Sequence, residues 1–96
     1  MDSTSNVLLT SNNYFQWKSH MKDLLRSKGL YQTTLGKEKA PTDDDKKVKW
    51  ANRSGEARGL IKMSISLDLR FHLQGIDGPD EAWTMLKAMF GKLNMF

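Results

Sequence analysis

The chain of 96 residues carries 15 Lys and Arg against 11 Asp and Glu, a formal net charge of +4, and contains no cysteine. This length suits one small domain, and the absence of cysteine excludes disulfides, thiol nucleophiles and Cys-based metal sites. No apolar run approaches the roughly 20 residues of a transmembrane helix, and the polar N-terminus lacks the basic and apolar regions of a signal peptide. We therefore expect no membrane partner.

The first third of the chain predicts a tail, a short arm and one long helix. Residues 1–6 are polar and are expected to form a disordered tail, while residues 7–96 are expected to form one helical domain cut from a longer chain. An extended segment at residues 7–9 should pack against the first helix, predicted over residues 14–28. Its caps are expected from Ser11, Asn12 or Asn13 and from Gly29, and its apolar face holds Tyr14, Trp17, Met21, Leu24 and Leu25.

The middle of the chain predicts a short element and then the longest helix. Apolar residues at positions 30, 31 and 35 indicate a short helix or turn before a polar loop. The long helix, over residues 43–64, begins with a hydroxyl cap at Thr42 followed by three aspartates at the positive end of the helix dipole. Gly55 and Gly59 each weaken a helix by about 1 kcal/mol relative to alanine, and these small residues predict close approach of another helix. The expected inward face comprises Trp50, Ala57, Ile61 and either Ser64 or Ile65.

The last third predicts a short helix over residues 66–73, with Leu67, Phe71 or Leu73 inward, and then a final helix. Gly78-Pro79-Asp80-Glu81 has the cap, first-turn proline and acids of a helix start. The apolar stripe of this helix holds Ala82, Trp83, Leu86, Met89 and Phe90. The chain therefore predicts an all-α bundle of about four to five helices, with a core shared by the three tryptophans.

Side chains that could perform chemistry are sparse. His20 and His72 have no ligand partner at helical spacing, and no serine stands in a nucleophile motif. No glycine-rich phosphate loop is present either. The sequence thus predicts no enzyme, no catalytic residue, no metal site, no cofactor and no small-molecule substrate.

Two groups of residues are candidates for binding. Basic residues concentrate between positions 37 and 58, where Lys46, Lys47, Lys49 and Arg53 could contact phosphates. A solvated helix face is the favoured alternative, because charge runs mostly face water.

Glycines at positions 29, 36, 75 and 91 could act as hinges, so a homo-oligomer, as a simple or domain-swapped dimer, is expected. The apolar surface covered by another copy is expected at Val7, Leu8, Leu9, Leu93, Met95 and Phe96.

Four short patterns in order resemble one family. They are Leu9-x-x-x-Asn13-Tyr14-x-x-Trp17-x-x-x-Met21-x-x-x-Leu25; Leu30-Tyr31 before Gly36; Trp50, Ala57 and Ile61-x-x-Ser64-Ile65; and Glu81-Ala82-Trp83-x-x-Leu86-x-x-x-Phe90. Over residues 8–92 they resemble the N-terminal part of the Gag polyprotein of copia-type LTR retrotransposons. One departure is Ser11-Asn12, where the family commonly has a glycine.

The resemblance implies a capsid-like lobe, similar to retroviral capsid proteins, that self-assembles into a cytoplasmic virus-like particle around the element's RNA, most commonly in plants. RNA binding is then implied for the missing part of the parent polyprotein, with its Cys/His zinc knuckle. Two alternatives remain: a domesticated Gag-derived adaptor that binds a peptide or protein in an apolar groove, and a small basic helical domain that binds nucleic acid. The implied structural signature is Tyr14, Trp17, Met21, Leu25, Trp50, Ala57, Ile61, Trp83, Leu86 and Phe90.

Overall fold

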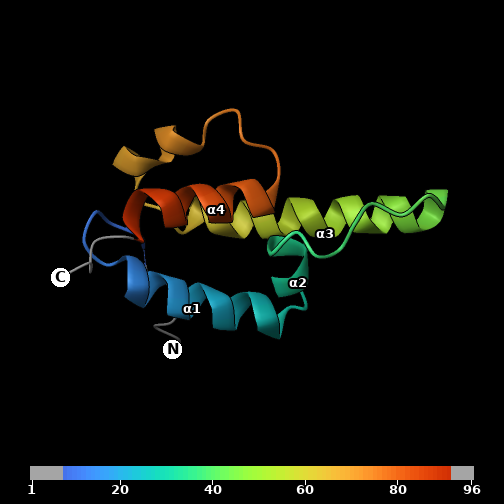
Figure 1. Cartoon of the computed structure of the whole chain (residues 1–96), viewed down its shortest axis with the longest axis horizontal. Helices are drawn as coiled ribbons and strands as arrows, with labels where there is room; N and C mark the ends of the chain where they lie inside the picture. The colour runs from blue at the N-terminus through green and yellow to red at the C-terminus, as the bar shows by residue number, and fades with distance from the viewer. Residues whose placement is uncertain (1–7, 92–96) are drawn as a thin grey trace.

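The computed structural model describes residues 8–91 (Figure 1). Loops join the helices of this part of the chain, and one isolated β-bridge pairs Leu9 with Ile65. The elements in order are α1 (Tyr14–Ser27), α2 (Tyr31–Thr34), α3 (Asp44–Met63), the 3-10 helix η2 (Leu67–Leu73) and α4 (Pro79–Phe90). The predicted all-α bundle is therefore confirmed. Within residues 8–91, no helix has the length and apolar character that crossing a membrane requires. The predicted tail at residues 1–6 lies outside the described residues.

Local sequence signals set where α3 and α4 begin. The Asp43 carboxylate caps α3 by accepting a hydrogen bond from the backbone N–H of Lys46 at 3.0 Å. The expected cap at Thr42 was therefore wrong by one residue. The prediction for α4 is confirmed, because Gly78 precedes the helix and Pro79 occupies its first turn, where a missing N–H costs nothing.

The start of α1 is organised differently from the expectation. The Asn13 side chain makes no cap hydrogen bond to the helix. Its oxygen accepts from the backbone N–H of Thr10 at 2.7 Å, and its nitrogen donates to the Leu8 carbonyl at 2.8 Å. Asn13 therefore fixes the turn that leads into α1, while the first N–H groups of the helix have no side-chain cap from this residue.

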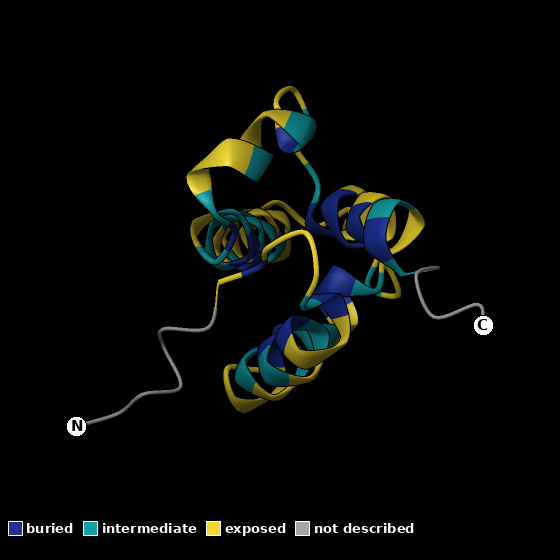
Figure 2. Cartoon of the chain, turned by 90° about the vertical axis from the view of Figure 1, so that its left-hand side faces the viewer, coloured by how far each residue is buried: buried dark blue, intermediate teal, exposed yellow. Residues whose placement is uncertain are grey.

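The core lies where α1, α4 and the C-terminal half of α3 meet, and their buried faces turn toward one another (Figure 2). Within this core, the ring centroids of Trp17 and Trp83 lie 5.6 Å apart. The Trp17 indole N–H donates to the Ser64 carbonyl at 3.1 Å and to its hydroxyl at 3.0 Å, which satisfies the one polar atom of a fully buried ring. The buried apolar residues are Leu9, Tyr14, Trp17, Met21, Leu25, Leu30, Ala57, Ile61, Ile65, Leu73, Ala82, Trp83, Leu86 and Phe90.

The segment before α1 is extended, as predicted, and pairs with the end of α3. The Leu9 N–H donates to the Ser64 carbonyl at 2.8 Å, and the Ser66 N–H donates to the Leu9 carbonyl at 3.1 Å. This pairing directs the Leu9 side chain into the core, where it is fully buried. The expectation that Leu9 forms partner surface was therefore wrong.

The N-terminal part of α3 projects from the body of the molecule (Figure 1). At 1.5 Å per residue, the 20 residues of α3 span about 30 Å, whereas the 12 residues of α4 beside it span about 18 Å. Residues 44–49, which we call the arm, are all exposed. Trp50 follows directly and is only half-buried, outside the core. Its assignment to the shared tryptophan core was wrong, because Trp50 lies outside the buried cluster and its indole N–H bonds the Glu38 carbonyl in the loop after α2.

The two glycines of α3 do not mediate close helix packing. A Cβ built at Gly55 or at Gly59 would meet no heavy atom within 4 Å. The prediction of close approach was therefore wrong within residues 8–91, and both positions have open space above them.

Candidate interaction surfaces

The two histidines stand apart from any cluster of possible metal ligands. Both are half-buried, and the His72 ring stacks on Phe71 with 4.0 Å between ring centroids. Among residues 8–91, no three His, Asp or Glu side chains come together in a group that could hold a metal ion.

A cleft of about 420 Å³ opens between α2, the middle of α3 and the start of α4. Its floor is one face of α3, formed by Ala51, Ser54 and Gly55. Trp50 and Glu38 line one end, and residues 77–80 line the other. Because the floor residues are small, α3 leaves open space here that larger side chains would fill.

Glu38 organises the Trp50 end of the cleft. Its carboxylate accepts a hydrogen bond from the Thr33 hydroxyl at 2.5 Å and pairs with Arg53, while its backbone carbonyl accepts from the Trp50 indole N–H at 2.9 Å. The Thr33 hydrogen bond, and next the Arg53 guanidinium, hold the pKa of the Glu38 carboxyl below its usual value. These contacts tie the loop after α2 to the base of the arm.

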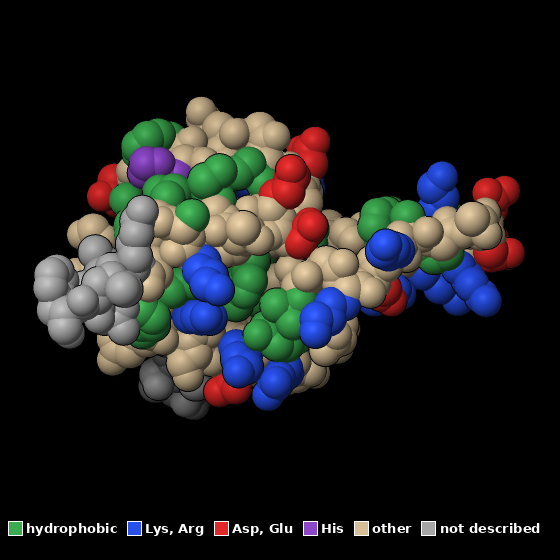
Figure 3. Space-filling model, in the orientation of Figure 1, with side chains coloured by type: hydrophobic (Ala, Val, Ile, Leu, Met, Phe, Trp, Pro, Cys, Tyr) green, Lys and Arg blue, Asp and Glu red, His purple; other side chains and the backbone are tan. Residues whose placement is uncertain are grey.

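Arg53 therefore differs from the three lysines with which it was predicted to contact phosphates. Its guanidinium is already paired with Glu38, in the part of α3 that follows the arm. Lys46, Lys47 and Lys49 lie on the exposed arm (Figure 3). Within residues 8–91 the ion pairs are Arg53–Glu38 and Arg58–Asp77, so these lysines have no acidic partner there. Phosphate binding by the lysines stays a prediction.

The other end of the cleft is acidic and loosely paired. Arg58 donates to the Asp77 carbonyl at 3.4 Å and lies 3.8 Å from its carboxylate, distances that indicate weak contacts. The Asp77 side chain is 94% exposed. Asp80 lies against the backbone of Gly36, which has φ +74°, and a Cβ there would stand 3.2 Å from the Asp80 carboxylate. The lining thus holds three carboxylates and one cation, Arg58, in a chain whose net charge is +4.

An exposed apolar group gathers at the opposite end of α3. We call it the apolar patch: Leu8, Met63, Leu67 and Phe71, which are 44%, 65%, 79% and 59% exposed. The pairing of Leu9 with Ile65 brings Leu8 beside the end of α3. The Arg70 guanidinium donates to the Ile65 carbonyl at 3.0 Å and to the Met63 carbonyl at 3.4 Å, which folds η2 over the same end.

The patch overlaps the predicted partner surface in one residue. Leu8 is exposed as expected, whereas Val7, Leu93, Met95 and Phe96 lie outside the described residues. Of the three inward candidates in η2, Leu73 is buried, while Leu67 and Phe71 face solvent. Among the three patch residues that were not predicted, only Met63 had a sequence signal, since it lies two positions from the buried Ile61 and therefore off the inward stripe of α3.

The three surfaces occupy different parts of the molecule. The arm and the apolar patch lie at the two ends of α3, and the cleft lies beside its middle. Comparisons of the chain with protein-family models, with curated proteins and with solved structures find no match.

Proposed function

We propose that the chain is the N-terminal capsid-like lobe of a copia-type Gag polyprotein, a structural protein that self-associates and contributes to a particle around the element's RNA. The apolar patch carries this proposal, because large apolar side chains at one end of a small domain mark a protein contact. The buried cluster formed by Tyr14, Trp17 and Trp83 also supports it, since these residues belong to the patterns that resemble the family.

The size of the patch fits a weak contact between copies. The patch comprises four exposed apolar residues, against the roughly 20–30 residues a side of a standard interface. A standard interface buries about 800 Å² per partner. Weak contacts that repeat many times can still hold a shell together, because linked contacts raise the effective concentration of one another.

Sedimentation of the chain over a wide concentration range tests this proposal. We expect reversible self-association in the range of roughly 10 µM to 1 mM, as suits a small apolar interface. Leu67→Lys and Phe71→Lys should each weaken it about tenfold, by burying an unpaired charge. Met85→Lys is the matched control, since Met85 is a 39% exposed methionine on α4, outside the patch.

The part of the association that Leu67→Lys and Phe71→Lys remove should depend little on salt, because the patch contact is apolar. Circular dichroism checks that each variant keeps the helix content of the wild type. A wild-type chain that stays monomeric at about 1 mM, or patch variants that associate as well as the wild type, would count against the proposal.

A further inference from the structure

The arm is a helical segment whose residues are all exposed. Helical segments this short are not stable alone in water, so residues 44–49 remain helical as an extension of α3, held at its base by the Trp50–Glu38 and Arg53–Glu38 contacts. Val48 on the arm is 61% exposed. The apolar side chain and three unpaired lysines make the arm a surface that another molecule can cover.

One face of α3 connects the arm to the cleft. Lys47, Val48 and Ala51 recur at steps of three and four, and the same steps continue through Ser54, Gly55 and Arg58. Residues 51, 54, 55 and 58 line the cleft. A helix that packs on the exposed part of this face therefore also covers the mouth of the cleft.

Charge decides which occupant fits. Asp77 and Asp80 line the cleft together with Glu38, which is already paired with Arg53, and Arg58 is held there only by long contacts to Asp77. A complementary occupant brings lysines for the carboxylates and an acid for Arg58. The arm has both, with Lys46, Lys47 and Lys49 on its sides and Asp44 and Asp45 at its start (Figure 3).

We propose that the occupant of the cleft is the arm of a second copy, with the two α3 helices crossing antiparallel around Ala51. Residues equally far before and after Ala51 then face each other, so Lys47 meets Gly55 and Asp44 meets Arg58. The open space over Gly55 receives the lysine stem and Val48, and the lysine ammonium reaches the carboxylates of the cleft walls. A cleft of about 420 Å³ holds these side chains, while the helix itself lies across the mouth, since a helix is about 10 Å wide.

This contact is symmetric, because each copy supplies one arm and one cleft. It rests on the proposed self-association and adds a second kind of contact to it. The apolar patch lies at the other end of α3 and stays free in such a dimer. Two different contacts on each copy allow dimers to join into an extended array, which one closed contact does not.

A charge swap tests the crossed arms. In Lys47→Glu the arm repels the acidic cleft, and in Asp77→Lys the cleft repels the basic arm, so each variant alone should lose about tenfold or more in self-association at low salt. Asp77 suits the test because its side chain is 94% exposed and its replacement should leave the fold intact. Mixing the two labelled variants should restore association, measured by energy transfer, since both arm–cleft contacts of the mixed dimer are then attractive.

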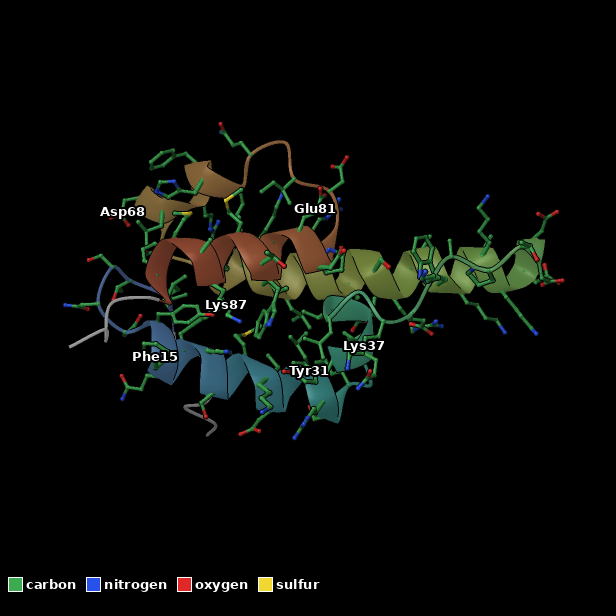
Figure 4. The ribbon with its side chains drawn as sticks, viewed as in Figure 1. Phe15, Tyr31, Lys37, Asp68, Glu81 and Lys87 are labelled. Atoms are coloured by element: carbon green, nitrogen blue, oxygen red, sulfur yellow. The ribbon has the colours of Figure 1, made fainter. Side chains whose placement is uncertain are left out.

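Lys87→Glu is the matched control. Lys87 is exposed on α4, away from the arm and the cleft (Figure 4), and its reversal changes the net charge by the same amount as Lys47→Glu. It should leave association unchanged. The wild-type arm contact should weaken with added salt, unlike the contact through the apolar patch.

Several outcomes overturn the crossed-arm contact. One is a Lys47→Glu chain that associates like the wild type. Another is a mixture of the two variants that associates no better than either alone. The third is a Lys47→Glu chain that loses only its binding to a single-stranded RNA probe, which assigns the lysines to phosphates. If Leu67→Lys alone abolishes association, the crossed arms are wrong and the proposed function stands; a monomeric wild type overturns both.

Discussion

The two halves of α3 have different surroundings although they belong to one helix. In the C-terminal half, Ala57 and Ile61 are fully buried against the core. In the N-terminal half, residues 44–49 are exposed, and the helix is fixed by its Asp43 cap and by contacts with Glu38. The Asp43 cap and the contacts with Glu38 thus keep residues 44–49 helical beyond the part of α3 that packs on the core. One element can therefore serve as core in one half and present a surface in the other.

The tryptophans show the same contrast. The indole N–H of Trp17 bonds Ser64 inside the core, and that of Trp50 bonds the carbonyl of Glu38 at the surface. Trp17 is fully buried, whereas Trp50 is half-buried. The polar group of each ring is satisfied in the same way, so the difference in burial should decide what each ring contributes to stability.

The largest expected loss of stability comes from replacing a buried tryptophan. Trp17→Ala should lower the free energy of unfolding by about 3–5 kcal/mol, because it removes a large ring and leaves a cavity at the centre of the core. Trp83→Ala should fall in the same range, since the two rings contact each other. For a domain this small, such a loss approaches its whole stability. Urea unfolding measures it, and an unchanged midpoint for either variant would refute the assignment of that ring to the core.

Trp50→Ala should have a smaller effect, about 1 kcal/mol, from lost partial burial and one hydrogen bond. We expect the change in the loop that carries Glu38 and not in the core. Hydrogen exchange should therefore rise for residues 37–42 and stay unchanged in α1 and α4. A loss as large as that of Trp17→Ala would show that the arm end of α3 supports the fold as strongly as the core end.

Sequence periodicity predicted burial correctly in the C-terminal half of α3 and wrongly at Trp50 in the N-terminal half, for a physical reason. The stripes of α1 and α4 gave correct buried residues, such as Met21 and Leu86, because each helix has a core beneath its whole length. Periodicity places Trp50 on the same face as Ala57, but it does not say how far a neighbouring helix extends. The exposure of Leu67 and Phe71 could not be predicted either, since the bridge at Leu9 and the hydrogen bonds of Arg70 place η2 through tertiary contacts.

A still smaller change in stability is expected at the two glycines of α3, which should differ in their effect on association. Gly59→Ala should stabilise the fold by about 0.5–1 kcal/mol, because alanine favours a helix and the added methyl meets open space. Gly55→Ala should stabilise the isolated chain similarly, but its methyl occupies the floor of the cleft. Thermal unfolding at low concentration and sedimentation at high concentration separate these effects. Weaker association for Gly55→Ala, with normal association for Gly59→Ala, is the result expected if the arm docks in the cleft.

The smallest effect concerns the ionisation of Glu38 at the base of the arm. The native state lowers the pKa of this carboxyl from its usual 4.5, through the Thr33 hydrogen bond and the Arg53 guanidinium. A carboxyl with a lowered pKa adds stability above its unfolded pKa, and this stability is lost as the pH falls through its native pKa. Wild type should therefore exceed Glu38→Gln in stability near pH 7, and the difference should shrink below pH 4.5.

Glu56→Gln is a suitable control for this pH series. Glu56 is exposed on α3, and no ion pair within residues 8–91 includes it. Its replacement should produce no comparable dependence on pH. Hydrogen exchange at residues 37–42 gives the local measurement, since protonation of Glu38 should loosen this loop first. A difference between wild type and Glu38→Gln that is constant from pH 7 to pH 3 would mean that the Glu38 charge does not anchor the arm, and that the Trp50 hydrogen bond to its backbone carbonyl does so alone.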